Sequence, residues 1–393
     1  MTVRASVLFC VVAILLCLDS VLKVNVSGLY LQAGLLIAVI SFALMALSHR
    51  HFQWKEVFKD RGIVLIIILT LSHFYMATDL SVYFRMLFYL LMFFVVYAFV
   101  FLSIKNVNIG KLSFYCVLIL CLSGMAQYIL TNYGNGLHLR GMDAEYYLKN
   151  GDLAYRMRGF FLEPNWFGLI LFSWFYVYYR SISNIYSSNF IILLLISIVC
   201  LLLSGNRLIL IFSCAIVVIK YLQFRNFKVI NKLPMIVLLA SGIVFWILAL
   251  WGDFDDRSAA ARLYTAYQTI SILETSSISE LLFGYGFSNW GGYSNILELS
   301  WSNYTFDQEL TRRDNSEMYV VLFEMGVVGV LIYLYDVYFL TTRKNSNILD
   351  RYFIVFIYIA SFVYPLYTFM MYMMPYMIIR SSILRGNDDK SFN

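Results

Sequence analysis

The side chains of this sequence that are best suited to chemistry stand together, a few residues before a long apolar segment. The run Arg312-Arg313-Asp314-Asn315 precedes the apolar residues 320–331. A carboxylate can take a proton from a hydroxyl group, and guanidinium groups bind phosphate oxygens through paired hydrogen bonds. Charged groups at the end of a membrane helix are costly unless they meet a charged or polar partner. This run is therefore the first candidate for an active site.

The composition indicates what kind of scaffold positions these residues. The chain has 393 residues, of which 61% are hydrophobic and 13% charged, and its mean hydropathy is +0.74. A soluble globular domain carries about 25% charged residues. The sequence therefore predicts a polytopic membrane protein that forms one transmembrane domain over residues 1–393.

Apolar segments recur along the whole chain. Most approach the roughly 20 residues that a helix needs to cross a bilayer. The prediction is an all-α bundle of about 11–12 transmembrane helices. The segments lie at about 5–18, 28–48, 62–77, 86–104, 112–130, 159–179, 189–203, 208–222, 234–251, 316–341 and 352–379.

The distribution of lysine and arginine predicts the orientation, because loops that stay in the cytoplasm retain positive charge. Loops 49–61, 223–233 and 342–351 are rich in both residues. Counting crossings from these loops places loops 131–158 and 252–315 together on the opposite, external side, which is the periplasmic side if the protein is bacterial, as the resemblance given below implies. The second of these is long enough to hold structure of its own, and we expect an amphipathic helix over 257–273 that lies on the membrane or caps a cavity.

The C-terminal end leaves the number of crossings open. Eleven crossings would place Arg380, Arg385 and Lys390 outside, against the charge rule. A division of segment 352–379 at Pro365 gives twelve crossings and a cytoplasmic tail. We favour the divided form.

Arginines gather on the predicted periplasmic side, where few positive charges are expected. Pairing with loop carboxylates is one explanation for any single arginine. For the whole set an anionic ligand such as phosphate is the better explanation, because guanidinium matches phosphate oxygens in a two-pronged geometry. The set comprises Arg140, Arg156, Arg158, Arg207, Arg257, Arg262, Arg312 and Arg313.

Four motifs in this half of the chain resemble those of the O-antigen polymerase and O-antigen ligase superfamily of integral membrane glycosyltransferases. Each lies at the predicted periplasmic end of a helix, and together they cover residues 155–330. They are Arg156-Met157-Arg158-Gly159 leading to Glu163-Pro164-Asn165, then Ser204-Gly205-Asn206-Arg207, then Leu282-Phe283-Gly284-Tyr285-Gly286, and finally Asp314-Asn315 followed by Glu324-Met325-Gly326. Members of the family commonly have His-Asn where this chain has Asp314-Asn315.

The resemblance implies a fold similar to that of the GT-C glycosyltransferases and a glycan donor linked to undecaprenyl diphosphate. The departing diphosphate would need cations, a role assigned to Arg158, Arg207 and Arg313. Asp314 is the candidate base for the acceptor hydroxyl, and Glu163 is the second choice. No metal or other cofactor is implied, and Asp253, Asp255 and Asp256 are interpreted as a solvated loop. The remaining predicted ligands of the donor are Arg156, Asn165, Arg262, Arg312 and Asn315.

The absence of the usual histidine favours an O-antigen polymerase of the bacterial inner membrane, with its active site facing the periplasm. An O-antigen ligase that transfers glycan to the lipid A core stays an alternative. A flippase or exporter of lipid-linked sugars is the third, because it too would be polytopic, basic and rich in aromatic residues. Expected partners are the lipid-linked oligosaccharide, the lipid bilayer and, in the cell, a chain-length regulator and a flippase; no nucleic acid is expected.

Overall fold

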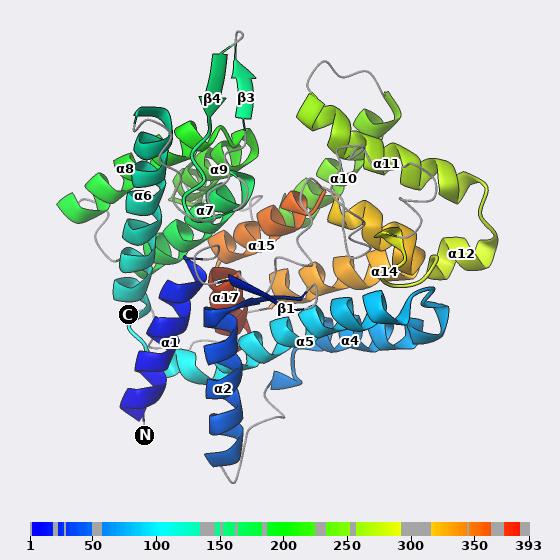
Figure 1. Ribbon diagram of the computed structural model, residues 1–393, viewed down its shortest axis with the longest axis horizontal. Coiled ribbons are helices and arrows are strands. Elements are labelled where there is room, and N and C mark those ends of the chain that lie inside the picture. The colour runs from blue at the N-terminus through cyan, green and yellow to red at the C-terminus, as the bar shows by residue number, and fades with distance from the viewer. Residues whose placement is uncertain are drawn as a thin grey trace. The chain divides into compact units, whose positions relative to one another are not determined.

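A computed structural model describes most of the chain, and Figure 1 shows it as a ribbon. The described elements are mainly α-helices. The described residues are 2–18, 23–26, 29–48, 57–133, 146–149, 152–161, 164–182, 187–224, 233–251, 257–291, 316–343, 346–362 and 373–385.

The described chain divides into two compact units. The first contains Met1–Phe52, Val95–Tyr221 and Tyr372–Asn393. The second contains Gln53–Phe94 and Leu222–Met371. Each unit is therefore assembled from segments that are far apart in the sequence.

Helices of the first unit pack around α7, whose residues are buried along most of its length. The helices α6 and α8 both pack against α7, as does α17, and α1 packs against α2 and α6 (Figure 1). Large aromatic side chains such as Trp174 and Phe167 fill this interior. The helices are α1 (Thr2–Leu16), α2 (Ala33–Ser48), α6 (Ile109–Tyr133), α7 (Pro164–Ser181), α8 (Ser188–Ser204), α9 (Arg207–Phe224) and α17 (Met374–Arg385), with the short 3₁₀ helix η3 (Ile104–Asn106).

The second unit is centred on α14, which packs against α4, α11, α12 and α15. Its interior contains a cluster of Trp290, Val320 and Phe323, and a second cluster in which Ala266 and Ile270 contact Tyr319. The elements are α4 (Arg61–Ser72), the 3₁₀ helix η2 (His73–Met76), α10 (Leu233–Trp251), α11 (Arg257–Glu274), α12 (Ile278–Phe283), α14 (Glu317–Thr341) and α15 (Ile348–Ala360). The long helix α5 (Leu80–Ser103) begins in this unit and ends in the other.

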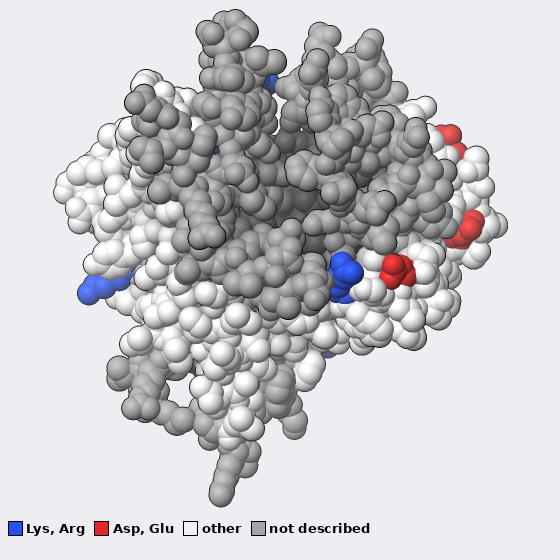
Figure 2. All heavy atoms as spheres, viewed as in Figure 1, with Lys and Arg blue, Asp and Glu red and all other residues white. Residues whose placement is uncertain are grey.

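Three of the described helices are long and apolar enough to cross a membrane: α5, α6 and α14. Several others are apolar but shorter, among them α2, α8 and α10. The described surface in Figure 2 is dominated by uncharged residues, with charged side chains in a few places. Exposed leucine, isoleucine and valine side chains are numerous on α8, α9 and α10. These features are those of a protein whose surface meets hydrocarbon.

Most of the helices expected from hydropathy are present, and two differences have a clear physical cause. The expected helix over 28–48 begins only at Ala33, because Leu29–Gln32 forms strand β2 and pairs with β1 (Lys23–Val26) in an antiparallel hairpin. Tyrosine and valine favour strands, and Ser27-Gly28 between the two strands suits a two-residue turn.

The second difference lies in the periplasmic loop expected over 131–158. Tyr146–Lys149 (β3) pairs with Asp152–Tyr155 (β4), and Asn150-Gly151 stands between the two strands. Asn-Gly is the strongest short-range hairpin signal in a sequence. The loop therefore contains a hairpin that hydropathy alone does not reveal.

The described part of the C-terminal segment contains two helices, α15 and α17, and the number of crossings stays a prediction. The intervening Pro365 lies outside the described residues. Arg380 and Arg385, which were expected in a cytoplasmic tail beyond the last crossing, are part of α17. Arg380 is 1% exposed and donates to the Tyr376 hydroxyl at 2.8 Å, and the Arg385 guanidinium lies 4.3 Å from the centre of the Phe101 ring. Aromatic faces and hydroxyl groups take the place of water around these cations.

Candidate functional site

The turn between α8 and α9 contains the second predicted motif, Ser204-Gly205-Asn206-Arg207. Gly205 ends α8 in the left-handed conformation, with φ of 64°, and its N–H donates to the Leu202 carbonyl oxygen at 3.0 Å. A side chain is disfavoured at such a position because its Cβ would clash with the backbone. Asn206 and Arg207 follow at once, so the turn presents polar groups at the start of α9.

Arg156 connects this turn to the start of α7. Its Nε donates to the Ser204 carbonyl oxygen at 2.6 Å, and its Nη2 lies 3.5 Å from the Asn165 Oδ1. A Cβ added to Gly205 would lie 3.0 Å from the Arg156 Nε, so the glycine also makes room for the guanidinium group. Two predicted ligands, Arg156 and Asn165, are therefore neighbours in the structure, although nine residues separate them in the sequence.

Asn206 makes the second connection between these helices. Its side-chain oxygen accepts from the Ile209 N–H at 3.3 Å, which is the bond of a helix N-cap, and its amide nitrogen donates to the Asn165 carbonyl oxygen at 3.2 Å. The start of α7 and the start of α9 are thus joined directly. Arg207, the first residue of α9, is exposed at this junction.

This junction, which we call the arginine turn (Arg156, Asn165 and 204–207), has the electrostatic character of an anion site. The first N–H groups of a helix have no partner within the helix, and the helix dipole adds partial positive charge there. Two helix starts meet here, each from a helix of 18 residues, and two arginines accompany them. A phosphate or diphosphate is the ligand that such an arrangement suits.

Arg158, two residues beyond Arg156, lies inside the same unit rather than on its surface. Its side chain is 3% exposed, and its backbone N–H donates to the Gln127 Oε1 at 3.0 Å. The preceding Met157 N–H donates to the Leu203 carbonyl oxygen at 3.1 Å. These bonds fix the segment 156–158 between α6 and α8. The backbone of this segment is thus held from both sides. Arg158 is too buried in this structure to be the first contact of a ligand that arrives from solvent.

The two glycine motifs of the second unit pair with each other. Helix α14 is broken at Gly326, which has φ of 63° and ψ of −164°. At the break the carbonyl oxygens of Phe323 and Glu324 accept from the N–H groups of Tyr285 and Gly286, both at 2.9 Å. Backbone groups that the break takes out of the helix therefore find partners in another segment, as membrane proteins require.

Space at this contact, which we call the glycine junction (284–286 with 323–326), excludes side chains. A Cβ at Gly284 would lie 2.4 Å from the Glu324 carbonyl carbon, and a Cβ at Gly326 would lie 2.4 Å from the Leu282 carbonyl carbon. Both glycines also have positive φ. A plain tight turn would explain Gly284 and Gly286 only in part, since these glycines also allow two backbones to touch.

Buried polar side chains surround the glycine junction. The His73 Nε2 lies 2.9 Å from the Phe283 carbonyl oxygen, and the Glu324 Oε1 accepts from the Trp290 N–H at 3.2 Å. Asn289 donates to the carbonyl oxygens of Met76 and Tyr285, at 2.9 and 2.6 Å. The sequence analysis assigned no role to His73 or Asn289. The signal that could have found His73 is an ionisable residue inside an apolar segment.

The first candidate run, 312–315, lies outside the described residues, as does Glu163. Arg262 belongs to α11, but its side chain is outside the described part of the structure. The described chain resumes at Ser316, whose hydroxyl donates to the Phe362 carbonyl oxygen at 2.8 Å. The proposed roles of these six residues therefore stay predictions.

The amphipathic helix expected over 257–273 is present as α11, Arg257–Glu274. Its buried residues Ala266 and Ile270 contact Tyr319 of α14. The intervening Tyr267 is exposed. The helix packs on α14 and lines a cavity, which agrees with the cavity alternative for this segment.

Comparison of the chain with models of known protein families and with characterised proteins finds no match.

Proposed function

We propose that this protein is a glycosyltransferase of the bacterial inner membrane that joins undecaprenyl-diphosphate-linked oligosaccharide repeat units on the periplasmic side, as an O-antigen polymerase does. The observation that supports this proposal most is the arginine turn, where the starts of α7 and α9 meet beside Arg156 and Arg207. The leaving group of the proposed reaction is a lipid diphosphate. Its negative charge grows as the glycosidic bond breaks, and preorganised positive groups lower the energy of that state.

In this proposal the residues of the arginine turn have different tasks. Arg207 is exposed and binds the diphosphate oxygens. Arg156 donates to the Ser204 carbonyl oxygen, and Asn206 donates to that of Asn165, so both hold the two helix starts in place. Pro164 has no N–H and Asn206 caps that of Ile209, so the added donors are the other first-turn N–H groups of α7 and α9, which need no rearrangement when the reaction occurs.

The acceptor sugar must lose a proton when it attacks, and Asp314 is the proposed base, with Glu163 as the second choice. Asp314→Asn should reduce chain growth by roughly 10²- to 10⁴-fold at an unchanged protein level, because an amide cannot accept the proton. If the Asp314→Asn protein is active, either Glu163 is the base or the reaction depends on electrostatic stabilisation by the arginines alone. Asp314→His introduces the residue common in the family and tests whether the position itself carries the base.

The proposal requires the arginine turn and loop 252–315 to face the periplasm, in a chain that crosses the membrane several times. A reporter enzyme that is active only in the periplasm should work when fused after Tyr304 and fail when fused after Arg343. The opposite result would remove the proposed orientation and the assignment of the site with it.

Purified protein incubated with lipid-linked repeat units tests the reaction itself. Chain growth in detergent, without a membrane to cross, requires an enzyme and excludes a transporter. The lipopolysaccharide of cells that lack the protein separates the two enzymes: a single repeat unit on the core indicates a lost polymerase, and bare core indicates a lost ligase. Unchanged lipopolysaccharide and no chain growth would together contradict the proposal.

A further inference from the structure

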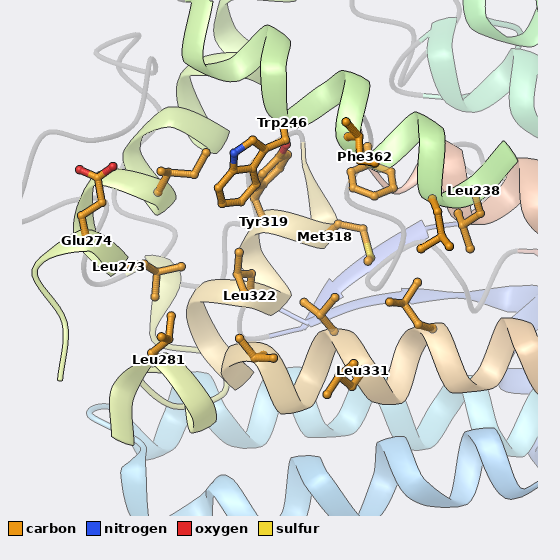
Figure 3. Close-up of a pocket in the computed structure, with 17 residues that line it drawn as sticks. Leu238, Trp246, Leu273, Glu274, Leu281, Met318, Tyr319, Leu322, Leu331 and Phe362 are labelled. Carbon is orange, nitrogen blue, oxygen red and sulfur yellow. The ribbon is translucent and has the colours of Figure 1, made fainter. Parts of the chain in front are cut away.

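The second unit contains an apolar cavity that the proposed reaction does not yet use. Its volume is about 630 Å³, within the range of about 300–1,000 Å³ that is typical of small-molecule sites. Side chains from α10, α11, α12 and α14 line it, together with Phe362, as Figure 3 shows. Apart from Glu274 and Tyr319, the lining residues are apolar or glycine. An occupant of this cavity must therefore be mainly hydrocarbon.

The rim of the cavity shows from which side an occupant enters. Three of its lining residues, Leu239, Ile243 and Leu331, are exposed by 52%, 61% and 57%. Neighbouring positions on α10 that do not line the cavity, such as Ile247, are exposed as well. The exposed lining residues are apolar except for Glu274, and a cavity with a mainly apolar rim on an apolar helix face opens toward hydrocarbon rather than water. The occupant is thus a molecule that resides in the bilayer.

One polar group inside the cavity indicates a second property of the occupant. Tyr319 is 4% exposed, and its hydroxyl group has no hydrogen-bond partner among the described residues. A buried hydroxyl without a partner is costly, and most such groups in folded proteins are paired. In Figure 3 Tyr319 and Trp246 are drawn among the lining side chains. A hydrocarbon chain with a hydrogen-bonding end would satisfy both the apolar lining and this hydroxyl.

We propose that this cavity holds part of the isoprenoid chain of the carrier that bears the acceptor repeat unit, with the polar end of that carrier beside the Tyr319 hydroxyl. This inference rests on the proposed function, which makes a polyprenyl diphosphate the substrate. Tyr319 is three residues from Ser316 and seven from Arg312, so the polar end of the cavity is close in sequence to the run 312–315. An acyl chain of an ordinary phospholipid is the competing occupant.

The test measures binding of undecaprenyl phosphate to the purified full-length protein by native mass spectrometry, with phosphatidylglycerol as the comparison lipid. Ile243→Trp fills the cavity from α10 and should weaken binding at least about tenfold. Ile247→Trp is the matched control, because Ile247 is on the same helix, is 52% exposed and does not line the cavity. It should leave binding unchanged. Leu331→Trp, on α14, repeats the test should the first variant fail to fold.

Tyr319→Phe tests the hydroxyl separately. It should weaken binding of undecaprenyl phosphate about 3- to 10-fold. The melting temperature of the lipid-free protein should stay equal or rise, because the substitution removes a buried hydroxyl that has no partner. A purely structural tyrosine would leave lipid binding unchanged.

Two outcomes overturn the inference: wild-type binding by both cavity variants, or equal affinity for phosphatidylglycerol with the same loss in those variants. Chain growth from lipid-linked repeat units is measured in parallel, and its failure is a separate result. A wild-type protein that binds the carrier through the cavity but builds no chain contradicts the proposed function and not the cavity. A cavity variant that builds chains normally contradicts the cavity and not the function.

Discussion

The arginine turn and the glycine junction use similar sequence patterns for opposite purposes. Each combines glycine with polar residues, but the turn 204–207 joins two apolar segments whereas residues 323–326 lie inside one. In the arginine turn the side chains of Arg156 and Asn206 make the contacts, and Arg207 stays exposed. In the glycine junction the backbones contact each other, and there is no space for a side chain at Gly284 or Gly326. The proposed function assigns ligand binding to the first region, whereas the second secures the fold.

Within such motifs, residues that can bind a ligand differ from residues that hold the backbone in place. Polar groups at the start of a helix leave N–H donors available to an anion. Polar groups at a break inside a helix must be paired within the protein, because lipid offers no hydrogen bonds. Substitutions in the arginine turn should therefore lower mainly activity, and substitutions in the glycine junction should lower mainly stability.

Gly326→Ala should have the largest effect. Its Cβ would lie 2.4 Å from the Leu282 carbonyl carbon, and the residue has φ of 63°, so both the contact and the backbone conformation oppose a side chain. We expect a loss of more than about 3 kcal/mol in the free energy of unfolding and little folded protein in the membrane. Thermal unfolding in detergent and the protein level in membranes measure this.

Gly242→Ala is the control for this substitution. Its Cβ would meet the Phe362 ring at 3.4 Å, an ordinary contact, and alanine favours the helix by up to about 1 kcal/mol. Equal stability of the Gly326→Ala and Gly242→Ala proteins would show that the glycine junction does not depend on close backbone contact.

Arg207→Ala should abolish chain growth without affecting the fold. The side chain is exposed, so stability should change little, whereas loss of one donor to the diphosphate costs roughly 10²- to 10³-fold in rate. Arg207→Lys keeps the charge but not the two-pronged geometry and should retain part of the activity. Arg343→Ala removes another exposed arginine, at the predicted cytoplasmic end of α14, and should be silent. Long chains made by a folded Arg207→Ala protein would place the diphosphate site elsewhere.

Asn206→Ala should have a moderate effect on both activity and stability. It removes the N-cap of α9 and the bond to the Asn165 carbonyl oxygen, a loss of about 1–2 kcal/mol. Asn206→Asp retains the capping oxygen but lacks the amide donor, so its stability should lie between those of the alanine variant and the wild type. Thermal unfolding and the chain-growth assay report the two effects. An alanine variant as stable as the wild type would mean that the two helix starts are held together by other contacts.

The smallest effect is expected at the start of α12, which leads into the glycine junction. Ser277 and Glu280 form a capping box, and the hydrogen bonds from Ser277 lower the pKa of the Glu280 carboxyl from its ordinary value of 4.5. A lowered pKa in the folded state means that the stabilisation is present above 4.5 and is lost as pH falls through the folded-state pKa.

Ser277→Ala should cost about 1 kcal/mol at neutral pH, and the difference from the wild type should shrink on acidification. Thermal unfolding of both proteins over the acid range measures it. A difference that stays constant would show that the Glu280 charge does not contribute.

Hydropathy predicted the helices well because the period and length of apolar runs follow directly from the sequence. It predicted α11 and the two helices at the C-terminus, whose bounds depend on local patterns. It missed the hairpin β3–β4, although Asn150-Gly151 marks it, because a polar loop carries no hydropathy signal. It also missed the break at Gly326, since that break depends on a partner segment 40 residues earlier in the chain, at Gly286.

The candidate site was likewise predictable in part from the sequence. The motifs placed Arg156, Asn165 and Arg207 in one region, and the structure joins the segments that carry them. The sequence could not predict which of Arg156 and Arg158 is buried. The difference in their exposure arises from the packing of α6, α7 and α8. His73 and Asn289 were missed because their partners are carbonyl oxygens more than 200 residues away.

The break in α14 also sets an order of assembly during synthesis. Every described partner of the break precedes it in the sequence. The N–H groups of Tyr285 and Gly286 bond to the break itself, and the segment that contains them is bonded to His73 and Met76. When the ribosome delivers α14, the groups that must satisfy its two displaced carbonyl oxygens have already been made. A helix interrupted in this way enters lipid with unpaired backbone groups unless that earlier segment meets it promptly. Deletion of residues 284–286 should therefore lower the amount of inserted protein even when the whole of α14 is retained.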